Sequence, residues 1–311
     1  MNQIDPKTIS RIRVYLFDRL IIGYCLLMAV LVAAVGRPVE FYYDEIIFYC
    51  AMAGIAALIV RYVDEEKSRL HKLVRLLYPG TMFTFFYRKT EGTIFLLFDR
   101  FLDPGLTNFE RAIFGVNPTI FIDQHLLNVW LNEIFSFCYF AYYFMIIVFL
   151  LILFYRKNYD VIKSSLGAMC LTFFSSYLLF FLYPIEGPRW HFGNAYVNQI
   201  EGPVFRRLVE FVIAKGAVHG GCMPSSHFGI ALVILMYTYR YYRRAAWVLA
   251  PLVAGLAVGT VWGRFHYVSD VVVGGLIGLI SVFFVWKYCT ISPDSGYNAS
   301  KSKEMKTENV S

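Results

Sequence analysis

The sequence predicts an all-α protein that crosses a membrane several times. Of its 311 residues, 58% are hydrophobic and only 16% are charged, whereas a soluble domain usually carries about 25% charged residues. Long uncharged stretches recur along the chain, and the charged residues gather between them. A helix of about 20 apolar residues is long enough to cross the hydrocarbon core. Together these observations predict a polytopic bundle of membrane helices.

Seven stretches without Lys, Arg, Asp or Glu are the candidates for membrane helices. In chain order they cover residues 20–36, 48–60, 134–155, 164–183, 227–239, 245–263 and 271–286. The stretches 48–60 and 227–239 must take residues from their flanks, because a crossing needs about 20 residues.

A further crossing is needed between residues 75 and 132 if successive helices are to alternate in direction. The candidate is 76–98, which carries Arg88, Lys89 and Glu91. Such charges are tolerated in a membrane helix when they pair, reach the interface or face protein. We expect a crossing here, which gives eight helices; the alternative is an interfacial segment.

Lys and Arg residues form five clusters that indicate the topology. The clusters precede residue 20 and follow residues 60, 155, 239 and 286. Positive clusters mark the cytoplasmic side of a membrane protein. We therefore expect both termini in the cytoplasm, and the segments 183–226 and 263–267 on the extracytoplasmic side. The net charge of +7 then reflects topology, and nucleic acid is not an expected partner.

Three other segments lie outside the predicted helices. Apolar residues are interleaved with polar ones in 99–131, which predicts an amphipathic cap on the outer interface. Residues 184–222 are rich in Gly and Pro and predict a polar loop, long enough to form a lid. Residues 291–311 are rich in Ser, Lys and Asn, which predicts a disordered cytoplasmic tail.

Two histidines stand at the extracytoplasmic ends of predicted helices. His266 and Asp270 are four residues apart, so on a helix they share one face. The carboxylate can then accept one imidazole proton and raise the basicity of the other nitrogen, which suits a nucleophile toward phosphorus. The alternative is an ordinary structural pair.

The second histidine, His227, follows Pro-Ser-Ser at 224–226, a sequence typical of a helix start. Free N–H groups at a helix start bind phosphate, and Ser225 or Ser226 adds a hydroxyl donor. His227 is placed to protonate a leaving oxygen. The alternative is a simple capped helix with an interfacial histidine.

Arg189 and Arg264 are the candidate phosphate ligands, because guanidinium groups bind phosphate oxygens in pairs. The alternative for both is an arginine that reaches the headgroup region. The chain has no nucleotide-binding or metalloprotease motif, and its six cysteines lack metal-site spacing. We expect no metal and no cofactor, with Cys222 as a free thiol beside the site.

The order of these motifs resembles the type 2 phosphatidic acid phosphatase superfamily. The resemblance covers about residues 76–290 and implies a six-helix catalytic core there, preceded in 1–75 by a cytoplasmic segment and two transmembrane helices. It implies that His266 is the nucleophile, Asp270 its partner and His227 the general acid. It also implies that phosphate is held by Ser225, Ser226, Arg189 and Arg264.

Two positions depart from the pattern of the phosphatases. These enzymes usually carry Lys seven residues before the first-motif Arg, and Arg six residues before the nucleophilic His; this chain has Leu182 and Thr260. The Arg-Phe-His-Tyr arrangement at 264–267 is more similar to the branch that holds inositol phosphorylceramide synthase and sphingomyelin synthase. Those enzymes pass a phosphorylated headgroup to a lipid alcohol.

The expected function is therefore lipid phosphoryl transfer at the extracytoplasmic face, by a phosphatase or an inositolphosphotransferase-like enzyme. The partners are membrane lipids: a phospholipid or lipid phosphate as substrate, and either water or a lipid alcohol as acceptor. A transporter or channel is the alternative, and it predicts charged residues in the middle of broken helices.

Overall fold

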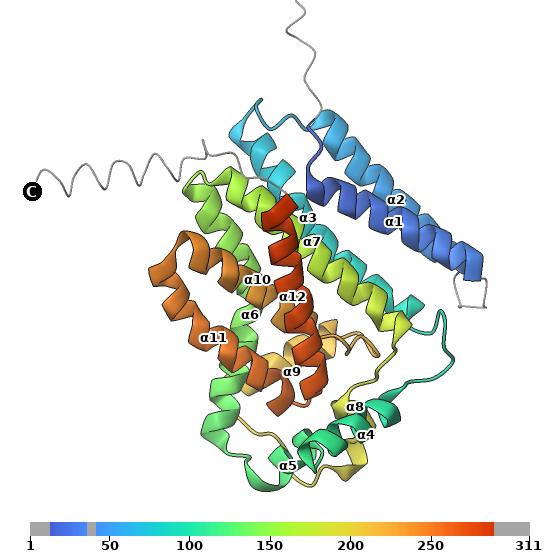
Figure 1. Ribbon diagram of the computed structural model, residues 1–311, viewed down its shortest axis with the longest axis vertical. Helices are drawn as coiled ribbons and strands as arrows, with labels where there is room; N and C mark the ends of the chain where they lie inside the picture. Colours follow the sequence, from blue (N-terminus) through green and yellow to red (C-terminus); the bar gives the residue numbers. More distant parts are fainter. Residues whose placement is uncertain (1–12, 36–41, 289–311) are drawn as a thin grey trace, which may run out of the picture.

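The computed structural model describes residues 13–35 and 42–288, and within them the regular structure is helical. Eight helices are long: α1 Leu16–Val35, α2 Tyr42–Tyr62, α3 Arg69–Lys89, α6 Val129–Tyr155, α7 Tyr159–Leu182, α10 Ser226–Tyr241, α11 Arg243–Trp262 and α12 Val268–Tyr288. They form one bundle, with α1 and α2 paired along one side (Figure 1). The predicted all-α fold is confirmed. The predicted tail 291–311 lies outside the described residues.

Six of these helices are long and apolar enough to cross a membrane: α1, α2, α6, α7, α11 and α12. This supports a multi-pass integral membrane protein. The most enclosed of the six is α7, which packs against α1, α3, α10 and α12. Helix α10 has 16 residues and lies inside the bundle between its neighbours (Figure 1).

Helix α3 differs from the predicted segment 76–98. It begins at Arg69 and ends at Lys89, and a short 3-10 turn, η2 Thr90–Thr93, follows. The expected domain boundary after residue 75 therefore falls inside a helix. Two of its charged residues form ion pairs: Lys89 contacts Glu45 at 2.9 Å, and the buried Arg75 pairs with the buried Asp18 of α1. Breaking one partner of a buried pair costs about 3–5 kcal/mol, so this pair fastens α1 to α3. That α3 crosses the membrane remains a prediction.

Glycine residues bring α10 and α12 into close contact. A Cβ atom on Gly274 or Gly278 of α12 would lie 2.2 Å from the Ser225 oxygen or 2.5 Å from the Gly229 oxygen, respectively. Only glycine leaves room for such an approach of two backbones. This crossing sets the distance between the start of α10 and the start of α12.

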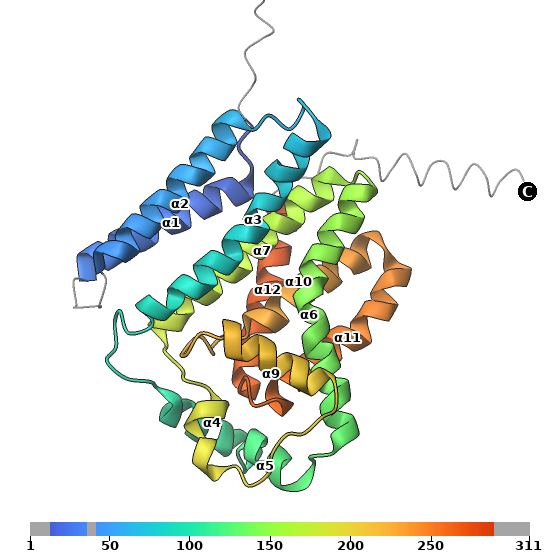
Figure 2. The ribbon, with the colours of Figure 1, turned by 180° about the vertical axis from the view of Figure 1, so that it is seen from behind.

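The segments between the long helices gather at one end of the bundle. Helices α4 Asp103–Phe114, α5 Pro118–His125 and α8 Pro188–His191, with the 3-10 turn η3 Gly193–Ala195, lie there, and α9 Phe205–Gly216 packs against α6 (Figure 2). The predicted amphipathic cap 99–131 thus contains two helices. The prediction of a loop throughout 184–222 is wrong over α9. Apolar residues at 205, 208, 209, 212 and 213 have helical spacing, but Gly and Pro flank them closely and obscured the pattern.

Candidate active site

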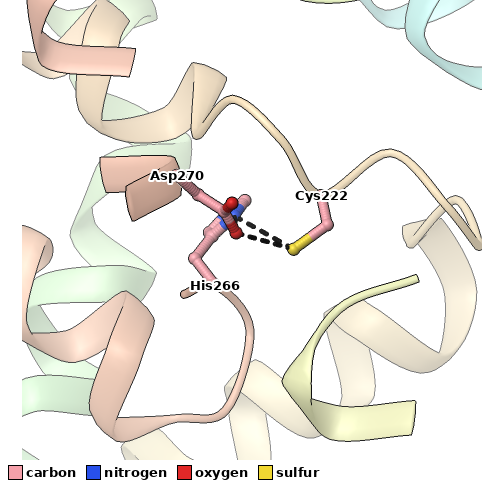
Figure 3. Close-up of side chains that lie close together, drawn as sticks. All are labelled: Cys222, His266 and Asp270. Carbon is pink, nitrogen blue, oxygen red and sulfur yellow. Dashed lines mark hydrogen bonds and ion pairs between the residues drawn. The ribbon is translucent and has the colours of Figure 1, made fainter. Parts of the chain in front are cut away.

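Three motifs far apart in the sequence meet at the capped end of the bundle. His266 Nδ1 lies 3.4 Å from Asp270 Oδ2, and the His227 and His266 rings are 5.9 Å apart between centroids. Figure 3 shows His266 and Asp270 side by side, with Cys222 opposite them. The structure therefore brings together the three residues that the sequence predicts to be catalytic.

The start of α12 brings His266 and Asp270 together. Helix α12 begins at Val268, so His266 lies in the preceding turn, and the expectation that both residues share a helix face is corrected. Asp270 turns back to accept a hydrogen bond from the Tyr267 N–H at 2.8 Å. The Phe265 and His266 amides both donate to the Thr260 carbonyl, at 2.9 and 3.1 Å. These bonds fix the turn that carries His266.

Asp270 is fully buried and faces two side chains through the same oxygen. Its Oδ2 accepts a hydrogen bond from the Cys222 thiol at 2.9 Å and lies next to His266 Nδ1. A proton on His266 Nδ1 is stabilised by this carboxylate, which leaves Nε2 as the nitrogen with a free lone pair. The arrangement suits a histidine that attacks an electrophile through Nε2.

Cys222, His266 and Asp270 are also the candidate metal ligands, since their donor atoms lie within 4.8 Å of one another. A metal would require the Cys222 thiolate. Burial, and the negative charge of Asp270, raise the pKa of the Cys222 thiol well above its usual range. In this structure the thiol is a hydrogen-bond donor to Asp270, and it would have to lose this proton to bind a metal. Independence of a metal remains a prediction.

The start of α10 places His227. Ser225 is the N-cap residue, as predicted, but its side chain makes no capping bond. Its amide donates to the Asp270 carbonyl at 2.9 Å instead, which joins α10 to α12. The Ser225 hydroxyl and His227 Nδ1 are buried and have no hydrogen-bond partner among the described residues. Such unpaired polar atoms are uncommon in native proteins and often mark functional sites.

The two predicted arginines have different surroundings. Arg189 forms a bidentate pair with Glu210, at 3.2 and 2.6 Å, and lines the same cavity as His227 and His266. Arg264 does not line that cavity. It binds Asp123 and donates to the Asn198 carbonyl at 2.7 Å. In this structure Arg264 therefore fastens the cap, and of the two predicted arginines Arg189 is the one that lines the cavity of the histidines.

Two cavities meet at His227. The smaller, about 70 Å³, is lined by Gly187, Arg189, Cys222 and both histidines. The larger, about 290 Å³, lies between α3, α6, α7, α9 and α10, and its lining includes five tyrosines: Tyr87, Tyr139, Tyr142, Tyr143 and Tyr177. The cavities share Tyr87, Tyr139, Ile213, Ala217 and His227. We call the larger one the tyrosine chamber.

A family comparison agrees with this arrangement. The family model of the PAP2 superfamily matches residues 105–284, which is more than half of the chain and includes all three motifs. The chain belongs to the PAP2 superfamily. No curated protein and no solved structure matched it.

Sequence reasoning missed the residues of this PAP2 protein that hold the motifs in place. Asp103 of α4 accepts the Glu186 and Gly187 amides at 2.7 and 3.0 Å and the Tyr267 hydroxyl at 2.9 Å. It therefore ties the first motif to the third.

Glu110, seven residues later on α4, accepts the amide and hydroxyl of Ser269 at 2.7 and 2.8 Å. Burial raises the pKa of Glu110. Asp103 and Glu110 are seven residues apart, so they share a face of the helix. This spacing is the feature of the sequence from which their shared role could have been predicted.

Proposed function

We propose that this protein transfers phosphoryl groups of membrane lipids through a phosphohistidine on His266. The observation that carries the proposal is the His266–Asp270 pair, with His227 next to it, on a cavity that Arg189 lines. Membership of the PAP2 superfamily supports the reaction class, which is phosphatase-type transfer from lipid phosphates.

In the first half-reaction, His266 Nε2 attacks the phosphorus atom. A P–N bond forms, and the bond from phosphorus to the leaving oxygen breaks. Asp270 stabilises the positive charge on the imidazole ring through Nδ1. Protonated His227 donates a proton to the leaving oxygen. Arg189, the two serine hydroxyls and the start of α10 offset the negative charge that the phosphate oxygens gain.

In the second half-reaction, neutral His227 removes the proton from an acceptor hydroxyl. The acceptor oxygen attacks phosphorus, the P–N bond breaks, and His266 is restored with its proton still on Nδ1, facing Asp270. Water as acceptor gives hydrolysis. An alcohol gives a new phosphomonoester when the donor is a lipid phosphate, and a new phosphodiester when the donor is a phospholipid whose headgroup stays on the phosphorus.

The tyrosine chamber favours a lipid alcohol as the acceptor. It has about 290 Å³ of space and mainly apolar walls, and it opens directly beside His227. An alkyl chain in this chamber loses contact with water, which is favourable, and its hydroxyl end is then next to the base. This supports an inositolphosphotransferase-like reaction, the branch to which the Arg-Phe-His-Tyr sequence is similar, over simple hydrolysis.

The charge distribution supports an extracytoplasmic site. Arg69, Arg156, Lys163, Arg243 and Lys287 stand at helix ends, and those ends lie opposite the capped end in Figure 1. Since positive residues face the cytoplasm, we infer that the motifs face away from it and that the substrate comes from the outer leaflet.

The test is a transfer assay with purified protein in detergent. A phospholipid labelled on phosphorus is supplied with and without a lipid alcohol, in the presence and absence of a chelator. Label should move to a new lipid when the alcohol is present, and the chelator should change little. His266→Ala should abolish turnover, whereas Asp270→Asn should leave a small residual rate, because it removes orientation but not the nucleophile. An unchanged phospholipid would refute the proposal and favour a transporter or channel.

A further inference from the structure

A buried arginine on α9 has unused hydrogen-bonding capacity. Arg206 is only 7% exposed. One of its terminal nitrogens binds Glu210, but its Nε and its other terminal nitrogen are buried and have no hydrogen-bond partner among the described residues. Buried polar groups in native proteins are nearly always paired, and a buried charge needs a partner most of all. The unpaired N–H groups lack an oxygen acceptor, and a phosphate carries several.

Glu210 is shared by two arginines. Arg189 binds both of its oxygens, at 3.2 and 2.6 Å, and Arg206 binds one of the same oxygens. The guanidinium carbons of Arg189 and Arg206 lie 6.0 and 5.4 Å from the centre of the Phe265 ring, and Phe265 is the neighbour of His266. The two arginines thus hold one anion between them, beside the predicted nucleophile.

We propose that Arg206 is a second phosphate-binding arginine, and that Glu210 is a resident carboxylate which the substrate phosphate displaces. Carboxylate and phosphate both accept bidentate hydrogen bonds from guanidinium groups, so one can replace the other between the same two arginines. A phosphate has more oxygen acceptors than a carboxylate, and these satisfy the unpaired Arg206 nitrogens. The proposal rests on the proposed function and names a residue outside the three motifs.

The local charges agree with an anion site. Burial, and the positive charges of Arg189 and Arg264, lower the pKa of Arg206 to about 10 against the opposing influence of Glu210. Arg206 also supplies a cation in a chain that has Leu182 and Thr260 where phosphatases of this superfamily usually carry basic residues.

Binding of inorganic phosphate to the purified protein in detergent tests the proposal without depending on turnover. The variants are Arg206→Gln, Glu210→Gln and, as the matched control, Arg207→Gln, which changes the exposed neighbouring arginine on the same helix. Calorimetry gives the dissociation constant, and inhibition of lipid phosphoryl transfer by phosphate gives the corresponding inhibition constant.

Arg206→Gln should weaken phosphate binding at least about tenfold, since it removes charge-assisted hydrogen bonds. It should also raise KM more than it lowers kcat. Glu210→Gln should tighten phosphate binding several-fold, because the competing carboxylate is gone. Arg207→Gln should behave as wild type.

Glu210→Gln is expected to change phosphate binding in the opposite direction to Arg206→Gln. This difference distinguishes a carboxylate that phosphate displaces from one that only holds the two arginines in place. If Glu210→Gln weakens phosphate binding as Arg206→Gln does, or if Arg206→Gln binds phosphate as wild type does, the proposal is overturned. Where Arg206→Gln does not fold, Glu210→Gln decides alone by the sign of its effect. Wild-type protein that binds phosphate but transfers none to lipid would overturn the proposed function and leave the anion site standing.

Discussion

The substitution Gly274→Ala tests whether the crossing of α10 and α12 sets the catalytic geometry. The new Cβ atom would lie 2.2 Å from the Ser225 oxygen and 2.9 Å from the Ser225 carbonyl carbon. Ordinary van der Waals contact begins at 3.4 Å, so the two backbones must separate by about 1.2 Å along this line. Both atoms belong to the backbone, and no side-chain rotation relieves the contact. The movement separates Ser225, which is two residues before His227, from α12, which carries Asp270.

A misplacement of about 1 Å at a catalytic group can lower the rate about 100-fold, whereas overpacking usually destabilises a protein by about 1–3 kcal/mol. Gly274→Ala should therefore fold and bind lipid but lose about two orders of magnitude in kcat. The assay is lipid phosphoryl transfer in detergent, with thermal unfolding measured in parallel. Gly23→Ala on α1 is the matched control, because nothing lies within 4 Å of its new Cβ. A Gly274→Ala protein with wild-type kcat, or an equal loss in Gly23→Ala, would refute the reasoning.

Three further outcomes are expected. Replacing His227 by Ala should slow substrates with alkoxide leaving groups far more than an activated aryl phosphate, whose oxygen needs little protonation; equal losses would leave His227 as a phosphate ligand only. With the exposed Cys50 replaced, a cysteine at the exposed Asn194 should react with a membrane-impermeant thiol reagent in intact cells, and one at Arg243 only after permeabilisation; the reverse result would invert the topology. Because burial raises the pKa of Glu110 from 4.5, the stability that its protonation contributes is present at low pH and is lost as the pH rises through the raised value. Glu110→Gln should therefore gain thermal stability relative to wild type as the pH rises above 4.5, and parallel profiles of thermal stability against pH would contradict this.

The helices of the bundle were predictable because a bilayer imposes a simple rule on sequence. A spanning helix needs a long apolar stretch, and six such stretches coincide with helices of the structure. Helix α3 obeys the rule less well, since it contains paired charges whose partners, such as Asp18, lie on other helices. Helix α9 was missed because it lies outside the apolar stretches and is only 12 residues long.

The histidine pair was predictable because its spacing is local. His266 and Asp270 are four residues apart, so any helix or helix start brings them close. The partner of Arg264 was not predictable in this way, because Asp123 lies 141 residues away. The same holds for Asp103 and Glu110: the sequence shows two carboxylates on one face but not which loops they contact. Long-range contacts of this kind depend on how the cap folds onto the bundle.

The two halves of the site differ in how they are held. On one side, Asp270 joins three segments: it accepts from Cys222 and Tyr267, pairs with His266, and receives the Ser225 amide at its carbonyl. These bonds form without a substrate, so His266 is preorganised.

On the other side, Arg189 and Arg206 share the single carboxylate of Glu210, which we propose the substrate phosphate displaces. Changes around Asp270 should therefore act mainly on kcat, since they alter geometry that only the transition state uses. Changes around Glu210 should act mainly on KM, since they alter the competition for the arginines before chemistry begins.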